Sequence, residues 1–119
     1  MTNPFKDQTK FMVACDQTVC EINAGQFILY KKLIEEEFQE LQDAKTQEEQ
    51  LDALIDILVV TIGAIHSMGA NGEGAWNEVM RTNFAKIDEE TGKVRKREDG
   101  KVLKPDGWKP PNLLPYLHK

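Results

Sequence analysis

The chain has 119 residues, of which 40% are hydrophobic and 29% charged, and it carries a formal net charge of −5. This composition excludes a disordered chain and predicts a single globular domain over residues 1–119. The negative charge disfavours a general nucleic-acid binder, because such proteins need a surplus of Lys and Arg to neutralise phosphates.

The N-terminal stretch, the longest apolar segment and the two cysteines indicate the location of the protein and the state of its thiols. The N-terminal stretch, MTNPFKDQTK, lacks the apolar run of a signal peptide. The longest apolar segment, residues 53–68, is short for a membrane span and contains Asp56 and His66. We therefore expect a cytoplasmic protein with no membrane partner. Cys15 and Cys20 match neither a CxxC pair nor a zinc knuckle, which favours two reduced thiols.

The first half of the chain predicts two helices. Residues 5–19 carry apolar side chains at helical spacing and no internal Gly or Pro, which favours an amphipathic helix. After a break at residues 23–25, apolar residues recur every three to five positions. A second helix should therefore run to about Ala44.

A third helix is predicted from about Gln47 to Met68. Thr46 begins a T-x-x-E capping box with Glu49, and Gly69 follows the last periodic residue. The C-terminal half, ILVVTIGAIHSMG, is apolar on nearly all sides and must be covered on more than one of them. In so short a chain the simplest cover is a second copy, so we expect a homo-oligomer, either a dimer or a tetramer.

The last third of the chain changes character. A fourth helix is predicted over residues 74–87, with Trp76 in its apolar stripe and therefore in the core. Residues 93–109 then hold seven Lys and Arg against three acids, with Gly-containing turns between short alternating pieces. This pattern predicts a basic loop or short hairpin. The prolines that follow make the tail extended.

Nine acidic residues crowd into the 22 residues from Glu35 to Asp56. Glu37 and Glu40 lie three apart in the second helix and share one face. The third helix presents a matching row at steps of three and four. Its members are Glu49, Asp52 and Asp56. If the two helices form an antiparallel hairpin, the two rows can meet.

Carboxylates that converge away from water repel one another unless a cation neutralises them. All-oxygen ligands favour Mg²⁺ or Mn²⁺. A ferritin-like di-iron site is excluded, since neither His66 nor His118 has a Glu three residues before it. The alternative is a solvated acidic face on which Glu49 serves only as a helix cap. Asp52 and Asp56 favour the metal, because their neighbours in the helix are Leu and Ile.

The pattern Glu37-x-x-Glu40, Glu49-x-x-Asp52 and Asp56, followed by ILVVTIGAIHSMG, resembles the E-x-x-E…E-x-x-D signature of the all-α nucleoside triphosphate pyrophosphohydrolases. These are the MazG-like and phosphoribosyl-ATP pyrophosphohydrolase-like enzymes. The segments RTNFAK, REDGKVLK and PPNL are similar to "R-S-N-M-S-K" and "DGKVLK…PPDL" of a small phage and bacterial branch. The resemblance implies a four-helix MazG-like bundle that is completed by oligomerisation.

The resemblance also implies an activity, the hydrolysis of a (d)NTP between the α and β phosphates to (d)NMP and pyrophosphate with Mg²⁺. The metal would be held by the residues that match the signature, with Glu37 or Glu40 as the base. These ligands would be Glu37, Glu40, Glu49 and Asp52, with Asp56 as a further ligand or as the group that orients a metal-bound water. The implied substrate contacts, to phosphate or sugar, lie in the two C-terminal segments. They are Asn83 and Lys86, with Arg81 and Lys101 as weaker candidates.

Two other functions stay open. One is a non-catalytic helical scaffold or regulatory oligomer, which would not need the metal spacing. The other is hydrolysis of phosphoribosyl-ATP, since the sequence does not define a base pocket. Trp108 is also left open, because it could cover a base or pack against a neighbouring subunit.

Overall fold

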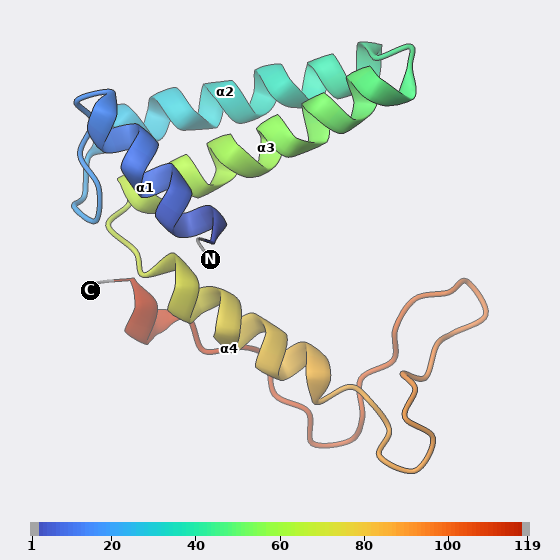
Figure 1. The fold of residues 1–119 in the computed structure, drawn as a ribbon. Coiled ribbons are helices and arrows are strands. Elements are labelled where there is room, and N and C mark those ends of the chain that lie inside the picture. Colours follow the sequence, from blue (N-terminus) through green and yellow to red (C-terminus); the bar gives the residue numbers. More distant parts are fainter. Residues whose placement is uncertain (1–2, 118–119) are drawn as a thin grey trace. The chain divides into compact units, whose positions relative to one another are not determined.

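The computed structural model describes residues 3–117, and its regular structure is helical (Figure 1). Within this range the only β-pairing is a set of isolated bridges. The predicted all-α fold class is therefore confirmed. The elements, in chain order, are α1 Pro4–Ala14, α2 Ala24–Asp43, α3 Gln47–Ser67, α4 Gly72–Phe84 and the short 3-10 helix η1 Leu114–Tyr116.

The helix starts follow local capping chemistry. Asn23, the N-cap of α2, accepts a hydrogen bond from the backbone N–H of Gln26 at 3.0 Å. Thr46, the N-cap of α3, accepts one from the backbone N–H of Glu49 at 3.1 Å. Each bond satisfies one of the donors that the first turn of a helix leaves without an intrahelical partner. The end of α2 and both bounds of α3 agree with the prediction to within one residue, whereas α2 begins at Ala24, inside the predicted break at residues 23–25.

The predicted end of the first helix is wrong. We expected this helix to continue to Val19, but α1 ends at Ala14. Asp16 has φ of +59°, a left-handed conformation that stops a helix, and the Gln17 backbone N–H donates back to the Met12 carbonyl at 3.0 Å. Residues 5–19 contain no Gly or Pro that would signal this break. Cys15 and Cys20 are both free thiols, as expected.

The described chain divides into two compact units, of which the first runs from Asn3 to Gly72 and also contains Tyr116 and Leu117. Within it α2 and α3 lie side by side as an antiparallel hairpin, and α1 packs against α3 (Figure 1). The core of this unit is built on Met12, Tyr30 and Ala64, all less than one-tenth exposed. The hairpin is the arrangement that lets the two acidic rows face each other.

Gly63 marks the closest approach of α2 and α3. A Cβ built on this residue would overlap the ring of Tyr30. The Tyr30 hydroxyl donates to Gln17 Oε1 at 2.6 Å, so the ring is fixed from its other end. The backbone of α3 can lie against an aromatic side chain of α2 only because residue 63 has no side chain.

The second unit, Glu73–Pro115, contains most of α4 and the chain that follows it. Two isolated bridges, Ile87 with Val94 and Lys96 with Val102, close turns in the basic segment. The extended part then returns along α4, where the Asn112 backbone N–H donates to Glu78 at 2.8 Å. Trp76 was predicted to be in the core, and that prediction is wrong. Its side chain is 58% exposed.

An apolar stripe on α3 is open to solvent. Its side chains lie at steps of three and four along the helix and are between 47% and 62% exposed. They are Leu51, Leu54, Ile55 and Leu58. Of the described helices, α3 is the one long and apolar enough to cross a membrane, a property that core helices of soluble proteins share.

Candidate metal centre

Three carboxylates meet on the α2–α3 hairpin. Glu37 and Glu40 come from α2 and Asp56 from α3, and one carboxylate oxygen of each lies within 4.8 Å of the others. The antiparallel arrangement brings residues that are 16 or more apart in the sequence onto facing helix surfaces. Glu37 and Asp56 are half-buried and Glu40 is exposed. The cluster thus opens to solvent on one side.

Burial and mutual repulsion disfavour the ionised forms of two carboxylates in the cluster. Burial raises the pKa of Glu37 to about 7, helped by a hydrogen bond with Glu40 and by the charges of Glu40, Asp56 and Asp52. Burial also raises the pKa of Asp56, with the charges of Asp52 and Glu40 adding to the effect. Glu37 Oε2 is buried and has no hydrogen-bond partner among the described residues. A cation would relieve both the repulsion and the missing partner.

These donors suit a hard divalent cation. All of them are carboxylate oxygens, the ligand type that Mg²⁺ and Mn²⁺ prefer, and the described part of the chain places no thiol or imidazole in the cluster. The buried oxygen of Glu37 offers a ligand atom that no other residue in the described range 3–117 hydrogen-bonds. The residues therefore fit the metal that the acidic spacing predicts.

Asp52 stands beside the cluster. Its charge raises the pKa values of both Glu37 and Asp56, which places it near them, but it is exposed and is not one of the three whose oxygens converge.

Glu49 is engaged in the start of α3. Its Oε1 accepts hydrogen bonds from the Thr46 hydroxyl at 3.1 Å and from the Lys45 backbone N–H at 3.3 Å. This carboxylate also lines a cavity of about 260 Å³ together with Glu40 and Asp52. The capping role expected from T-x-x-E is thus present.

The four predicted substrate contacts all lie in the second unit, where two of them touch each other. Lys86 Nζ donates to Asn83 Oδ1 at 3.1 Å and lies 4.9 Å from the ring centroid of Trp108. Lys101 is in the turn after Asp99, whose carboxylate accepts from the Lys101 backbone N–H at 3.0 Å.

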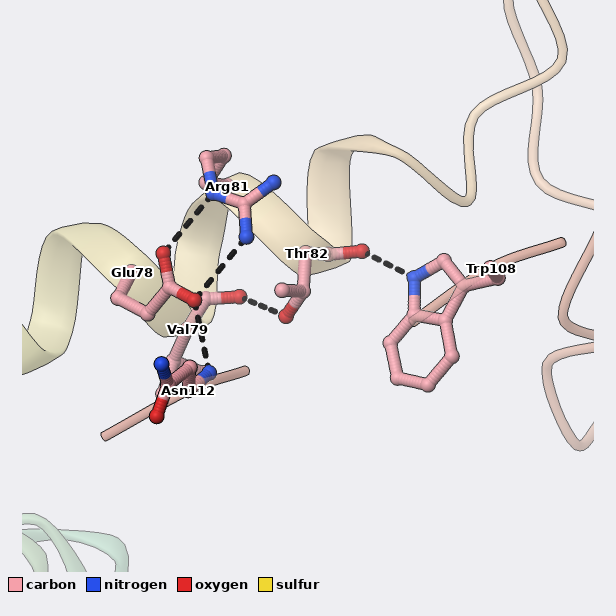
Figure 2. Close-up of polar contacts among 6 residues, drawn as sticks. All are labelled: Glu78, Val79, Arg81, Thr82, Trp108 and Asn112. Carbon is pink, nitrogen blue, oxygen red and sulfur yellow. Dashed lines mark hydrogen bonds and ion pairs between the residues drawn. The ribbon is translucent and has the colours of Figure 1, made fainter. Parts of the chain in front are cut away.

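Arg81 forms an ion pair on α4, with Nε 2.9 Å and Nη2 3.0 Å from the Glu78 carboxylate (Figure 2). Glu78 also accepts from the Asn112 backbone N–H. The hydrogen bond from Arg81, followed by that from Asn112, lowers the pKa of Glu78 to about 2. Arg81 is thereby held in one orientation on the helix surface.

Trp108 is the residue that the sequence left undecided. Its indole N–H donates to the Thr82 carbonyl at 2.7 Å, and a second lysine, Lys104, also lies 4.9 Å from its ring centroid (Figure 2). The Asp-Gly step before Trp108 signals a turn, but only the structure shows that this turn returns the indole to α4.

The comparisons with known proteins identify the family. A family model described as phosphoribosyl-ATP pyrophosphohydrolase matches residues 17–83, more than half of the 119 residues. A search of curated proteins finds no match. The matched range contains all five carboxylates of the two acidic rows and ends at Asn83. The chain therefore belongs to the phosphoribosyl-ATP pyrophosphohydrolase family, a family of soluble MazG-like all-α hydrolases that act on phosphoric anhydride bonds of nucleotides.

Proposed function

We propose that the protein is a Mg²⁺-dependent nucleoside triphosphate pyrophosphohydrolase, with Mn²⁺ as an alternative metal, that cleaves a (d)NTP between its α and β phosphates. The products are a (d)NMP and pyrophosphate. The observation that carries the proposal is the convergence of Glu37, Glu40 and Asp56, with one buried carboxylate oxygen left without a partner among the described residues. The family match supports the reaction class.

Each carboxylate has a proposed role. Glu37, Glu40 and Asp56 hold the metal, Asp52 completes the set from beside them, and Glu49 is the weakest candidate because it caps α3. The bound ion supplies positive charge that offsets the charge of the triphosphate.

The proton of the attacking water passes to a carboxylate oxygen of Glu37 or Glu40. A new P–O bond forms between the water oxygen and the α or the β phosphorus, while the bond from that phosphorus to the oxygen bridging the two breaks. The departing group keeps the electron pair of the broken bond. It is pyrophosphate after attack at the α phosphorus and the nucleoside monophosphate after attack at the β phosphorus.

The substrate contacts remain proposals. Asn83 and Lys86 are proposed to bind phosphate or sugar, with Arg81 and Lys101 as weaker candidates. The hydrogen bond between Lys86 and Asn83 supports their acting together. In a chain of net charge −5, such lysines attract phosphates locally without making a nucleic-acid surface.

The assembly and location are also proposed. The exposed stripe of α3 supports a homo-oligomer in which a second copy covers Leu51, Leu54, Ile55 and Leu58. We also propose that the enzyme is cytoplasmic and has no membrane partner, because a second subunit is enough to cover the apolar surface of α3.

The test is a product assay with matched variants. Glu40→Gln and Asp52→Asn should each lower pyrophosphate release by about a hundredfold or more, the usual size of a lost proton-transfer group or metal ligand. Glu36→Gln, which changes an exposed acid on α2, should keep full activity. Circular dichroism would verify that each variant stays helical. Full turnover in both Glu40→Gln and Asp52→Asn would refute the site.

A second substrate is favoured by the family match, which names phosphoribosyl-ATP. A panel of (d)NTPs and phosphoribosyl-ATP, with Mg²⁺ or Mn²⁺, would separate the two by comparing kcat/KM. Orthophosphate as the first product would reject cleavage between the α and β phosphates. A lack of both turnover and Mg²⁺ binding in calorimetry would instead identify a non-catalytic scaffold.

A further inference from the structure

A cavity of about 430 Å³ lies within the second unit, beside the C-terminal half of α4. Its volume falls in the range of about 300–1,000 Å³ that small-molecule sites usually occupy. The lining combines an aromatic and apolar wall with charged groups at the edge. The residues that line it are Arg81, Thr82, Ala85, Pro105, Asp106, Gly107, Trp108 and Lys109.

The aromatic wall is fixed in place. The indole N–H of Trp108 donates to the Thr82 carbonyl at 2.7 Å (Figure 2). Thr82 itself is only 2% exposed. The Trp108 backbone N–H donates to the Pro105 carbonyl at 3.1 Å, across a turn in which Gly107 has φ of +76°. A ring held at both its backbone and its N–H loses little freedom when a ligand packs against it.

The surroundings of this ring are positively charged. Arg81 and Lys109 line the cavity, while the Nζ atoms of Lys86 and Lys104 each lie 4.9 Å from the Trp108 ring centroid. Two acidic side chains among the described residues offset part of this positive charge. They are Asp106 in the lining and Glu78, which is already paired with Arg81.

This local excess of positive charge occurs in a chain whose net charge is −5. Among the described residues, Lys86, Lys104 and Lys109 have no carboxylate partner. An anionic ligand would therefore gain from binding here.

We propose that this cavity binds a nucleoside monophosphate unit, whose base takes the place of a lysine ammonium over the Trp108 ring and whose phosphate pairs with the surrounding cations. This inference rests on the proposed function for its ligand class, because a nucleotide is what that enzyme handles. An inorganic anion would use the cations and leave the apolar wall of Ala85, Pro105 and Trp108 without a partner. A base and a phosphate joined in one molecule use both.

The experiment uses the intrinsic fluorescence of Trp108. The chain has two tryptophans, so Trp76→Phe leaves Trp108 as the only one. In EDTA, which removes any metal-dependent binding, this variant is titrated with AMP, GMP, CMP and UMP. We expect saturable quenching by one or more of the monophosphates. The matching nucleosides and inorganic pyrophosphate should each bind at least about tenfold more weakly, because a nucleoside lacks the phosphate and pyrophosphate lacks the base.

Two further variants locate the site. Lys109→Ala should weaken monophosphate binding severalfold, whereas Lys93→Ala, an exposed lysine that does not line the cavity, should leave it unchanged. Trp108→Ala, followed by calorimetry, should weaken binding about tenfold or more. Trp108→Phe keeps a ring and should recover part of the loss even if the hydrogen bond to Thr82 is needed for the local fold.

Two results would overturn the proposal. Pyrophosphate binding as tightly as a monophosphate would define a simple anion site, and an absence of quenching by all four monophosphates would remove the site. Because the titration needs neither metal nor turnover, its failure is distinct from a failure of pyrophosphate release. An enzyme with full activity and no quenching would keep the proposed function and lose this cavity.

Discussion

Glu37 is the residue on which the chemistry of the hairpin centres. It combines a buried oxygen that has no partner among the described residues with a pKa raised to about 7. Such a carboxylate keeps its proton in the folded protein over a pH range in which it ionises in the unfolded chain. Metal binding must displace this proton, so folding, metal affinity and pH are linked through one side chain.

The first consequence is a pH dependence of stability. The unfolded chain releases the Glu37 proton near the ordinary value of 4.5, and the folded chain holds it until about 7. Because the folded state binds more protons in this window, the free energy of unfolding of the metal-free protein should fall as pH rises from about 4.5 to 7. Urea unfolding measured across the window in EDTA would show the slope.

Glu37→Gln should flatten this slope, since glutamine has no proton to release. Glu36→Gln, which changes an exposed neighbour, should leave it as in the parent protein. Equal slopes in the parent and in Glu37→Gln would show that Glu37 does not titrate with the folding equilibrium. The raised pKa of Asp56 acts in the same direction and leaves a smaller residual slope in the variant.

At the scale of the helices, Glu49 serves the start of α3 and stands at the edge of the acidic cavity. The Thr46 hydroxyl donates to the Glu49 carboxylate and accepts from the Glu49 backbone N–H, which stabilises the first turn. A carboxylate that accepts two hydrogen bonds at a helix end is less available to a metal than Glu37, whose buried Oε2 has no partner among the described residues. The structure thus separates Glu49 from Glu37, Glu40 and Asp56.

Two variants would measure this separation. Thr46→Ala should lower the free energy of unfolding by about 1 kcal/mol, the typical value of an N-cap side chain. Glu49→Gln should keep stability, because Gln can also complete the capping box, and should reduce Mg²⁺ affinity less than Glu40→Gln does. Urea unfolding and calorimetry give the two readouts. A loss of Mg²⁺ affinity in Glu49→Gln as large as in Glu40→Gln would make Glu49 a ligand.

The elements also show what the sequence could and could not predict. Apolar periodicity, the break at residues 23–25 and the capping box at Thr46 located α2 and α3 closely, because those signals are local. The end of α1 was missed, since Asp16 adopts a left-handed conformation without a glycine to signal it. The prediction that Trp76 is buried was wrong, because helical spacing shows that it lies on the apolar face of α4 but not whether another element packs against that face.

The acidic site was predicted in part. Spacing placed the five carboxylates on facing helix surfaces, yet it could not say which oxygens converge. That depends on how far α2 and α3 slide past each other, which packing inside the hairpin decides. The cavity beside Trp108 was not predictable, since it depends on a chain that returns to α4 more than 20 residues later.

At the scale of the whole molecule, the exposed stripe on α3 predicts the assembly state. Ile55→Glu places a charge in the middle of this stripe and should convert the oligomer to a monomer, because burying the charge would cost several kcal/mol. Light scattering gives the molar mass. Lys45→Glu, in the exposed turn before α3, is the matched control and should keep the parent mass. A parent protein that is already monomeric would contradict the proposed oligomer.

Gly63 has a consequence for the reaction although it carries no functional group. Tyr30 and Glu37 are seven residues apart on α2, as are Asp56 and Gly63 on α3, so each pair is separated by about two helical turns. The Gly63–Tyr30 contact therefore acts as a spacer that sets the gap across which Glu37 and Asp56 reach. A side chain at position 63 would push α2 and α3 apart at Tyr30, and we expect this to widen the gap between Glu37 and Asp56 and to weaken the binding of a small cation there.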